Sequence, residues 1–120
     1  MTFPVTVTGA SDDGSVKVLT WSGLSTADTG IPVSIPKFAD KTVTITGTFA
    51  AATIALQGSN DATNWFSLTD PQGNAISKTA AAIEAVTENP LWIRPAVTGG
   101  SGETDLHVII VARLSNNLRT

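Results

Sequence analysis

Hydrophobic and polar residues alternate in short runs along this chain, and turn-forming residues separate the runs. The clearest run is "KTVTITGTF", residues 41–49, in which Val43, Ile45, Gly47 and Phe49 share one side and four threonines share the other. A period of two is typical of an antiparallel strand with one buried face. We therefore predict a strand here, with its apolar side turned into a core.

Similar runs recur at short intervals, and their parity predicts which side chains point inward. In residues 53–58 these are Ile54 and Leu56, and in residues 64–70 they are Phe66 and Leu68, with Trp65 outward. In residues 104–114 the inward set is Leu106, Val108, Ile110 and Ala112. Further strands are predicted at residues 4–8, 16–21 and 91–98, with a weaker one at 74–77, while residues 82–88 fit either a strand or a helical turn.

About eight short strands with little or no helix predict an all-β fold, an antiparallel β-sandwich or jelly roll. The eighteen threonines and ten glycines of the chain agree with strands joined by turns. We expect a single domain. Residues 1–40 would supply N-terminal strands and an irregular segment at 22–36, whose two prolines disfavour a central strand, and residues 41–120 would form the sandwich core.

Composition narrows the classes of function. Only 14% of residues are charged and the net charge is −3, so we expect no nucleic-acid partner, which would require a basic stripe, and no polybasic membrane contact. The chain has no cysteine, which excludes disulfides and thiolate chemistry. Residues 1–4 lack the features of a secretory signal, so synthesis in the cytoplasm is expected. We predict no cofactor.

The stretch "GSNDATN", residues 58–64, allows two interpretations. Asn and Asp favour turns because their side chains bond nearby backbone, which predicts an exposed hairpin turn here. The alternative is a cation site that uses Asn60, Asp61 and Asp70. Calcium prefers several carboxylates, and the D-x-D-x-D-G loop pattern is absent, so we predict a turn and no metal site.

Two further stretches read as turns. "DPQG", residues 70–73, has Asp, Pro and Gly at the positions that a type I turn favours. "TGGSGETD", residues 98–105, carries three glycines and predicts a hairpin tip. Catalysis is not predicted, because the only histidine, His107, alternates with core positions and has no motif partner.

Four apolar side chains lie opposite the predicted core faces of their strands. Trp65 and Trp92 are predicted to point outward from two separate strands. Ile109 and Val111 are predicted to point outward from the last strand, which is therefore apolar on both faces. A second sheet or loop of the same chain, a subunit interface, or an aromatic platform for a sugar would each cover such residues. We therefore name Trp65, Trp92, Ile109 and Val111 as candidate interface residues.

The stretches "LQGSNDATNWFSLTDPQGNAIS" and "ENPLWIRPAVTGGSGETDLHVIIVAR" resemble small structural proteins of tailed-bacteriophage virions, nearest the head-decoration or cement proteins. The resemblance covers residues 41–113. It implies a homotrimer on the capsid surface that bridges subunits of the major capsid protein. A "GSNDGTNW"-like hairpin also occurs in discoidin-type sandwiches, although this chain has Ala62 where they often have glycine. The alternative is therefore a carbohydrate- or receptor-binding module of a phage tail or fibre.

Overall fold

The computed structural model describes residues 2–3, 5–9 and 15–114. This part of the chain forms eleven strands and no helix, so it contains no helix that could cross a membrane. The strands are β1 (Thr2–Phe3), β2 (Thr6–Gly9), β3 (Val16–Leu24), β4 (Thr29–Gly30), β5 (Asp40–Thr48), β6 (Ala52–Ser59), β7 (Phe66–Ser67), β8 (Ser77–Lys78), β9 (Ala82–Val86), β10 (Trp92–Gly99) and β11 (Asp105–Arg113). The all-β prediction is confirmed.

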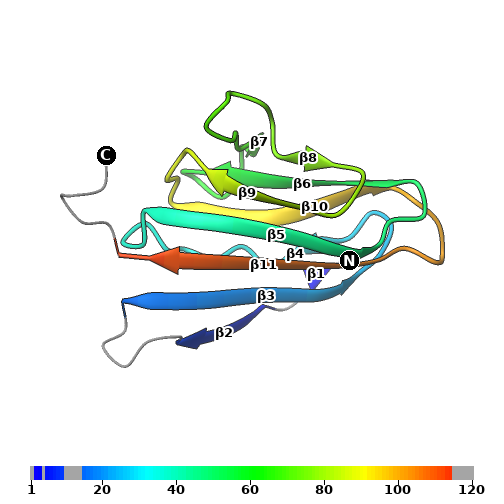
Figure 1. Cartoon of the computed structure of the whole chain (residues 1–120), viewed down its shortest axis with the longest axis horizontal. Coiled ribbons are helices and arrows are strands. Elements are labelled where there is room, and N and C mark those ends of the chain that lie inside the picture. The colour runs from blue at the N-terminus through cyan, green and yellow to red at the C-terminus, as the bar shows by residue number, and fades with distance from the viewer. Residues whose placement is uncertain (1, 4, 10–14, 115–120) are drawn as a thin grey trace.

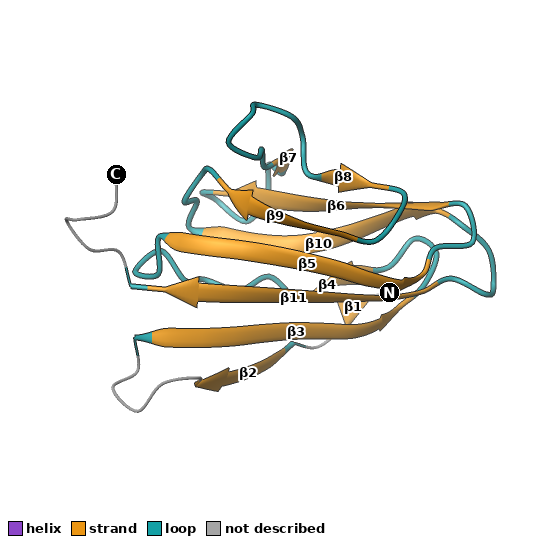
Figure 2. Cartoon of the chain, in the orientation of Figure 1, coloured by secondary structure: helices purple, strands orange, loops and turns teal. Residues whose placement is uncertain are grey.

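The strands form two sheets that pack face to face as a β-sandwich (Figures 1 and 2). Sheet A runs in the order β1-β4-β10-β6-β7, with β8 also paired to β6. Sheet B runs in the order β2-β3-β11-β5-β9. All the pairs between these strands are antiparallel except the short β1–β4 pair. Residues 82–86, which fitted a strand or a helical turn, are a strand at the edge of sheet B.

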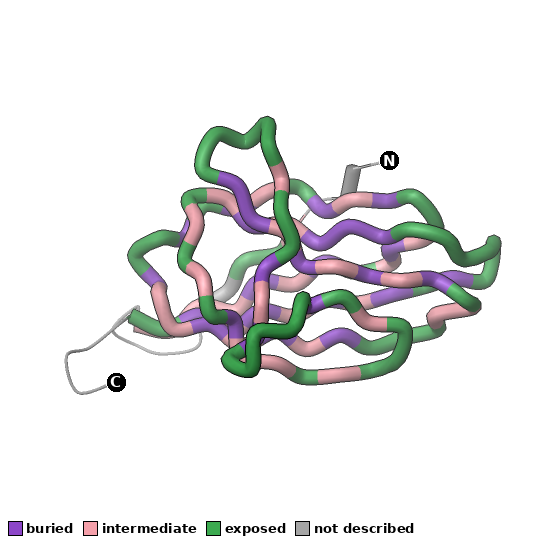
Figure 3. Tube along the Cα trace, turned by 90° about the horizontal axis from the view of Figure 1, so that it is seen from above, coloured by how far each residue is buried: buried purple, intermediate pink, exposed green. Residues whose placement is uncertain are grey.

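The core lies between the inner faces of the sheets. Figure 3 shows buried positions alternating with half-buried ones along the long strands, as the period of two predicts. The inward residues of β5, β6 and β11 are buried as expected: Val43, Ile45, Ile54, Leu56, Leu106, Val108, Ile110 and Ala112. β3 adds Leu19 and Trp21, which is fully buried, so residues before 41 also build the core.

The segment between β3 and β5 is anchored to sheet A. Val33 exchanges two backbone hydrogen bonds of 2.9 Å with Ile93, and the Trp21 indole N–H donates to the Ile31 carbonyl at 3.0 Å. A Cβ at Gly30 would overlap the Trp21 indole and the Pro95 ring, so only glycine lets β4 lie this close.

Two predictions, one about residues 98–105 and one about Phe66, are wrong. Residues 98–105 are not a hairpin tip but the connection from β10 in sheet A to β11 in sheet B, because glycines mark a turn without specifying which sheet the next strand joins. Phe66 is not in the core but 72% exposed, while Leu68 is buried as expected. β7 has only two residues and lies at the sheet edge, where strand parity no longer decides burial.

Candidate interaction surfaces

The loop after β6 is held by one carboxylate. Asp61 accepts hydrogen bonds from the Ser59 hydroxyl at 2.8 Å, from the backbone N–H groups of Thr63 at 2.9 Å and Asn64 at 2.8 Å, and from the Asn64 carboxamide at 2.7 Å. These donors favour the charged form and hold the pKa of Asp61 well below its usual range. Ala62 adopts the left-handed conformation, with φ of 61°. The loop joins two antiparallel strands, so the predicted turn is confirmed.

The second aspartate considered as a cation ligand also closes a turn. The Asp70 carboxylate accepts from the N–H groups of Gln72 and Asn74, each at 3.0 Å, and the Gly73 N–H donates to the Asp70 carbonyl at 2.9 Å. The turn predicted at residues 70–73 is therefore present. Across the described residues, no three His, Asp or Glu side chains are grouped so that they could hold a metal ion.

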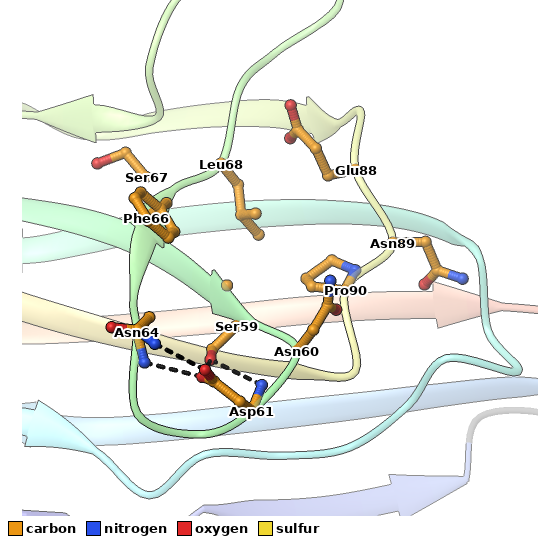
Figure 4. A pocket seen from close by; sticks show the side chains of 11 residues that line it. Ser59, Asn60, Asp61, Asn64, Phe66, Ser67, Leu68, Glu88, Asn89 and Pro90 are labelled. Carbon is orange, nitrogen blue, oxygen red and sulfur yellow. Dashed lines mark hydrogen bonds between the residues drawn. The ribbon is translucent and has the colours of Figure 1, made fainter.

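A pocket of about 780 Å³ opens beside the Asp61 loop (Figure 4). Asn64, Phe66 and Ser67 lie on one side of it and Glu88, Asn89 and Pro90 on the other; its remaining lining residues are Gly58, Ser59, Asn60, Asp61 and Leu68. Many of its polar groups already hold the chain together. For example, Asn60 accepts from the Leu91 N–H at 3.0 Å, and Glu88 accepts from the Thr69 N–H at 2.7 Å and from the Thr69 hydroxyl.

The outer surface of sheet A carries a cluster of Trp65, Trp92, Arg94 and Gln57, which we call the tryptophan face. The Arg94 guanidinium carbon lies 4.1 Å from the centroid of the Trp65 ring, a cation–π contact. The Arg94 Nε–H donates to the Gln57 carboxamide oxygen at 3.0 Å, on the neighbouring strand. Trp92 lies two residues before Arg94 on the same side of β10. All four are half-buried, and burial lowers the pKa of Arg94.

The outer surface of sheet B has a different character, and we call it the β11 face. At its centre Ile109 lies between Thr20 and Thr44, and Val111 lies between Val18 and Thr42. β9 extends the same surface with Ile83, which is 67% exposed. These central positions carry no charge. Figure 1 looks onto this surface, and no second layer of the described chain covers it.

The four candidate interface residues therefore lie on two opposite sides of the molecule. Trp65 and Trp92 belong to the tryptophan face, and Ile109 and Val111 belong to the β11 face. Strand parity showed correctly that Trp92, Ile109 and Val111 do not fill the core, since all three are only half-buried. One contact with one partner cannot bury all four.

A buried lysine beside the pocket was not singled out from the sequence. Lys41 is 1% exposed, and its ammonium donates to the Phe38 carbonyl at 3.1 Å and to the Asn89 carboxamide oxygen at 2.6 Å. Asn89 donates in turn to the Pro36 carbonyl at 2.8 Å. Burial lowers the pKa of Lys41 to about 8. The sequence feature that could have revealed it is the spacing of two residues between Lys41 and Val43, which places both on the inner side of β5.

His107 lies on the β11 face. Its Nε2 is 3.8 Å from the Asp105 carboxylate, and its side chain is half-buried on the side of β11 away from the core. His107 is therefore a residue of the outer surface of sheet B.

Comparison with known proteins reveals a shared fold. No family model and no curated protein matches the chain. The SPBc2 prophage-derived protein YomS matches with a TM-score of 0.61 at 10% identity, covering 81% of this chain and 93% of that protein. Peruvianin-I, a cysteine peptidase from Thevetia peruviana latex, matches with a TM-score of 0.52 at 12% identity. The match covers 93% of this chain but only 61% of the peptidase, and this chain has no cysteine.

Proposed function

We propose that this protein is a structural component of a tailed-phage particle, a head-decoration or cement protein that joins other virion proteins through two opposite faces. The observation that carries the proposal is the pair of outer surfaces described above, each of which presents side chains typical of protein interfaces. Two further facts support it. The sequence resembles virion structural proteins, and a prophage-derived protein has the same fold.

The tryptophan face is the surface proposed to dock on the major capsid protein. Trp and Arg are the residues most enriched among those that dominate binding energy at protein interfaces. Here the Trp65–Arg94 contact and the bond to Gln57 hold the side chains in place before any partner arrives. A preorganised side chain loses less conformational entropy on binding, which favours affinity.

The proposed mechanism is bridging. One molecule contacts neighbouring capsid subunits, so separating the subunits requires breaking these contacts as well as their own. Binding to the assembled shell but not to free subunits stabilises the shell by mass action. The β11 face offers a surface on which two copies of the chain can meet, in place of the three copies around an axis that the resemblance implies.

Cosedimentation tests the docking. Purified protein would be mixed with expanded heads of the phage or prophage that encodes it, pelleted, and the decorated heads imaged by electron microscopy. We expect wild-type protein to pellet with the heads and to raise their melting temperature. Trp65→Ala and Arg94→Ala should each weaken binding at least tenfold, as expected for a central anchor.

The matched control is Lys37→Ala, which removes an exposed cation at a position outside both faces and should leave head binding unchanged. The proposal would be refuted if the heads pelleted while the wild-type protein stayed in the supernatant at every concentration tested. Equal binding by wild type and by both tryptophan-face variants would reject this face as the docking surface.

One observation favours the second candidate function, a carbohydrate- or receptor-binding module. Phe66 is 72% exposed at the rim of the pocket, beside the carboxamides of Asn60 and Asn64. An exposed aromatic ring next to amides suits the stacking and hydrogen bonding of a sugar. Calorimetry with host cell-wall oligosaccharides checks this function: binding by the wild type that is lost in Phe66→Ala would favour it over the capsid role.

A further inference from the structure

β11 presents an ordered series of side chains on the β11 face. Residues 105, 107, 109, 111 and 113 point to the same side of the strand, since side chains alternate along it. The carboxylate of Asp105 is at one end, the guanidinium of Arg113 is at the other, and Ile109 is at the midpoint. Asp105 and Arg113 are both exposed, and Ile109 is half-buried.

We propose that the β11 face is a self-association surface on which two copies pack face to face about a two-fold axis that passes near Ile109. The strands of the two copies run antiparallel across the contact, so Arg113 of each copy meets Asp105 of the other. The inference rests on the proposed function, because it names the partner of one of the two faces: a second copy of this chain.

Charge selects this orientation. A two-fold axis along the strands would instead place Arg113 against Arg113 and Asp105 against Asp105, and such like-charge contacts oppose association. The antiparallel arrangement replaces both repulsions with two attractive pairs. On the neighbouring strand it brings Asp40, the register partner of Arg113, against the uncharged Thr48, the register partner of Asp105.

The geometry permits these pairs. Four residues of strand separate Ile109 from each charged end, about 13 Å at the usual rise. Packed sheets lie about 10 Å apart and cross at about 30°, which offsets the strand ends by roughly 7 Å. An arginine and an aspartate side chain can together span that separation.

The extent and chemistry of the surface also suit a pair. Three strands of nine residues, with the shorter β2 and β9, give a sheet face of roughly 600 Å², close to the ~800 Å² per partner of a standard interface. Its central positions, Val18, Thr20, Thr42, Thr44, Ile83, Ala85, Ile109 and Val111, are uncharged, so no charge must be desolvated at the centre. A trimer would need two different surfaces in contact, whereas this face complements itself.

Sedimentation equilibrium of charge-reversed variants tests the inference. We expect the apparent mass of the wild-type protein to be twice the 12.4 kDa mass of the chain at high micromolar concentration. Arg113→Asp and Asp105→Arg should each raise the dissociation constant of the dimer roughly tenfold or more, because each change creates two repulsive pairs. The double variant should return it to within about threefold of the wild-type value, since the pairs re-form with exchanged signs.

A further variant tests the axis. Ile109→Lys should give a folded monomer, because the new charge meets its own copy. The matched control is Lys37→Glu, a charge reversal at an exposed position outside both faces, which should dimerise like the wild type. Wild-type protein that stays monomeric at 1 mM, or that sediments as a trimer, would overturn the inference. The inference would also be overturned if the double variant formed dimers no more tightly than the weaker of the two single variants.

Failure here is distinguishable from failure of the proposed function. Heads decorated by wild-type protein without rescue in the double variant would reject the two-fold contact and leave the capsid role standing. Dimers with rescue but no binding to heads would keep the contact and reject the capsid role.

Discussion

Lys41 predicts an unusual pH dependence of stability. Its ammonium is buried between the sheets and donates to neutral oxygens of Phe38 and Asn89, and burial outweighs the opposing effect of Asp40 and lowers its pKa from 10.5 to about 8. Below pH 8 the lysine is protonated in both the folded and the unfolded chain, so folding includes the full desolvation of the charge. Between pH 8 and 10.5 the unfolded chain binds more protons than the folded one, so the free energy of unfolding rises with pH.

The size of the rise follows from the difference in pKa. At about 1.4 kcal/mol per pH unit, the interval from 8 to 10.5 corresponds to an increase of about 3 kcal/mol in the free energy of unfolding. Lys41→Met keeps the length of the side chain and removes the titrating group, so this increase should disappear. At pH 7 the free energy of unfolding of the variant rises because no charge has to be buried. It falls by about 1 kcal/mol for each of the Phe38 and Asn89 oxygens, since each loses its donor. The free energy of unfolding should therefore differ from that of the wild type by no more than about 2 kcal/mol.

Urea unfolding at pH 7, 8, 9, 10 and 11 measures this prediction. We expect the wild-type midpoint to rise across the alkaline range and the Lys41→Met midpoint to stay level. Lys78→Met is the matched control: Lys78 is paired with Glu84 at 2.7 Å near the surface, so its variant should keep the wild-type slope. A wild-type curve that is flat above pH 8, or equal slopes in wild type and Lys41→Met, would show that Lys41 does not titrate as its burial requires.

Four other variants test the local structure. Phe66→Ala should lower the free energy of unfolding by less than about 1 kcal/mol, because the ring is 72% exposed, whereas buried Leu68→Ala should lower it by about 2–5 kcal/mol; similar losses in urea titration would contradict the assigned burial. Asp61→Asn should lower the melting temperature at pH 7. Because the folded pKa of Asp61 is depressed, its contribution is present above the unfolded pKa near 4 and is lost as pH falls, so wild type and variant should converge in acid. Ala62→Gly should raise the free energy of unfolding by about 0.5 kcal/mol, since φ of 61° strains a residue with a Cβ; a measured loss would mean that the backbone entropy of glycine outweighs that strain.

Local alternation was enough to predict the long strands and their buried sides. In β5 and β11 the inward residues Val43, Ile45, Leu106 and Val108 are buried because a period of two, repeated along a nine-residue strand, leaves only one way to bury the apolar side. The same parity placed Ile109 outside the core. Turn chemistry was likewise local, as the Asp70 turn shows.

What the alternation could not specify was which strands share a sheet. β10 and β11 follow each other in the chain, yet β10 pairs with β6 in one sheet and β11 pairs with β5 in the other, through hydrogen bonds between residues tens of positions apart. For that reason residues 98–105 looked like a hairpin tip, and the four candidate interface residues could not be divided between two faces from the sequence.

The burial of Phe66 was also decided by tertiary structure. Its parity with Leu68 was read correctly from the sequence, but a two-residue edge strand has no opposing sheet over it, so the ring stays in water beside the pocket. The sequence by itself thus determined the strands, their turns and which residues avoid water in the long strands. Only the tertiary structure decided that the outward residues form two separate faces, because which outer surface a strand joins depends on long-range pairing rather than on any local pattern.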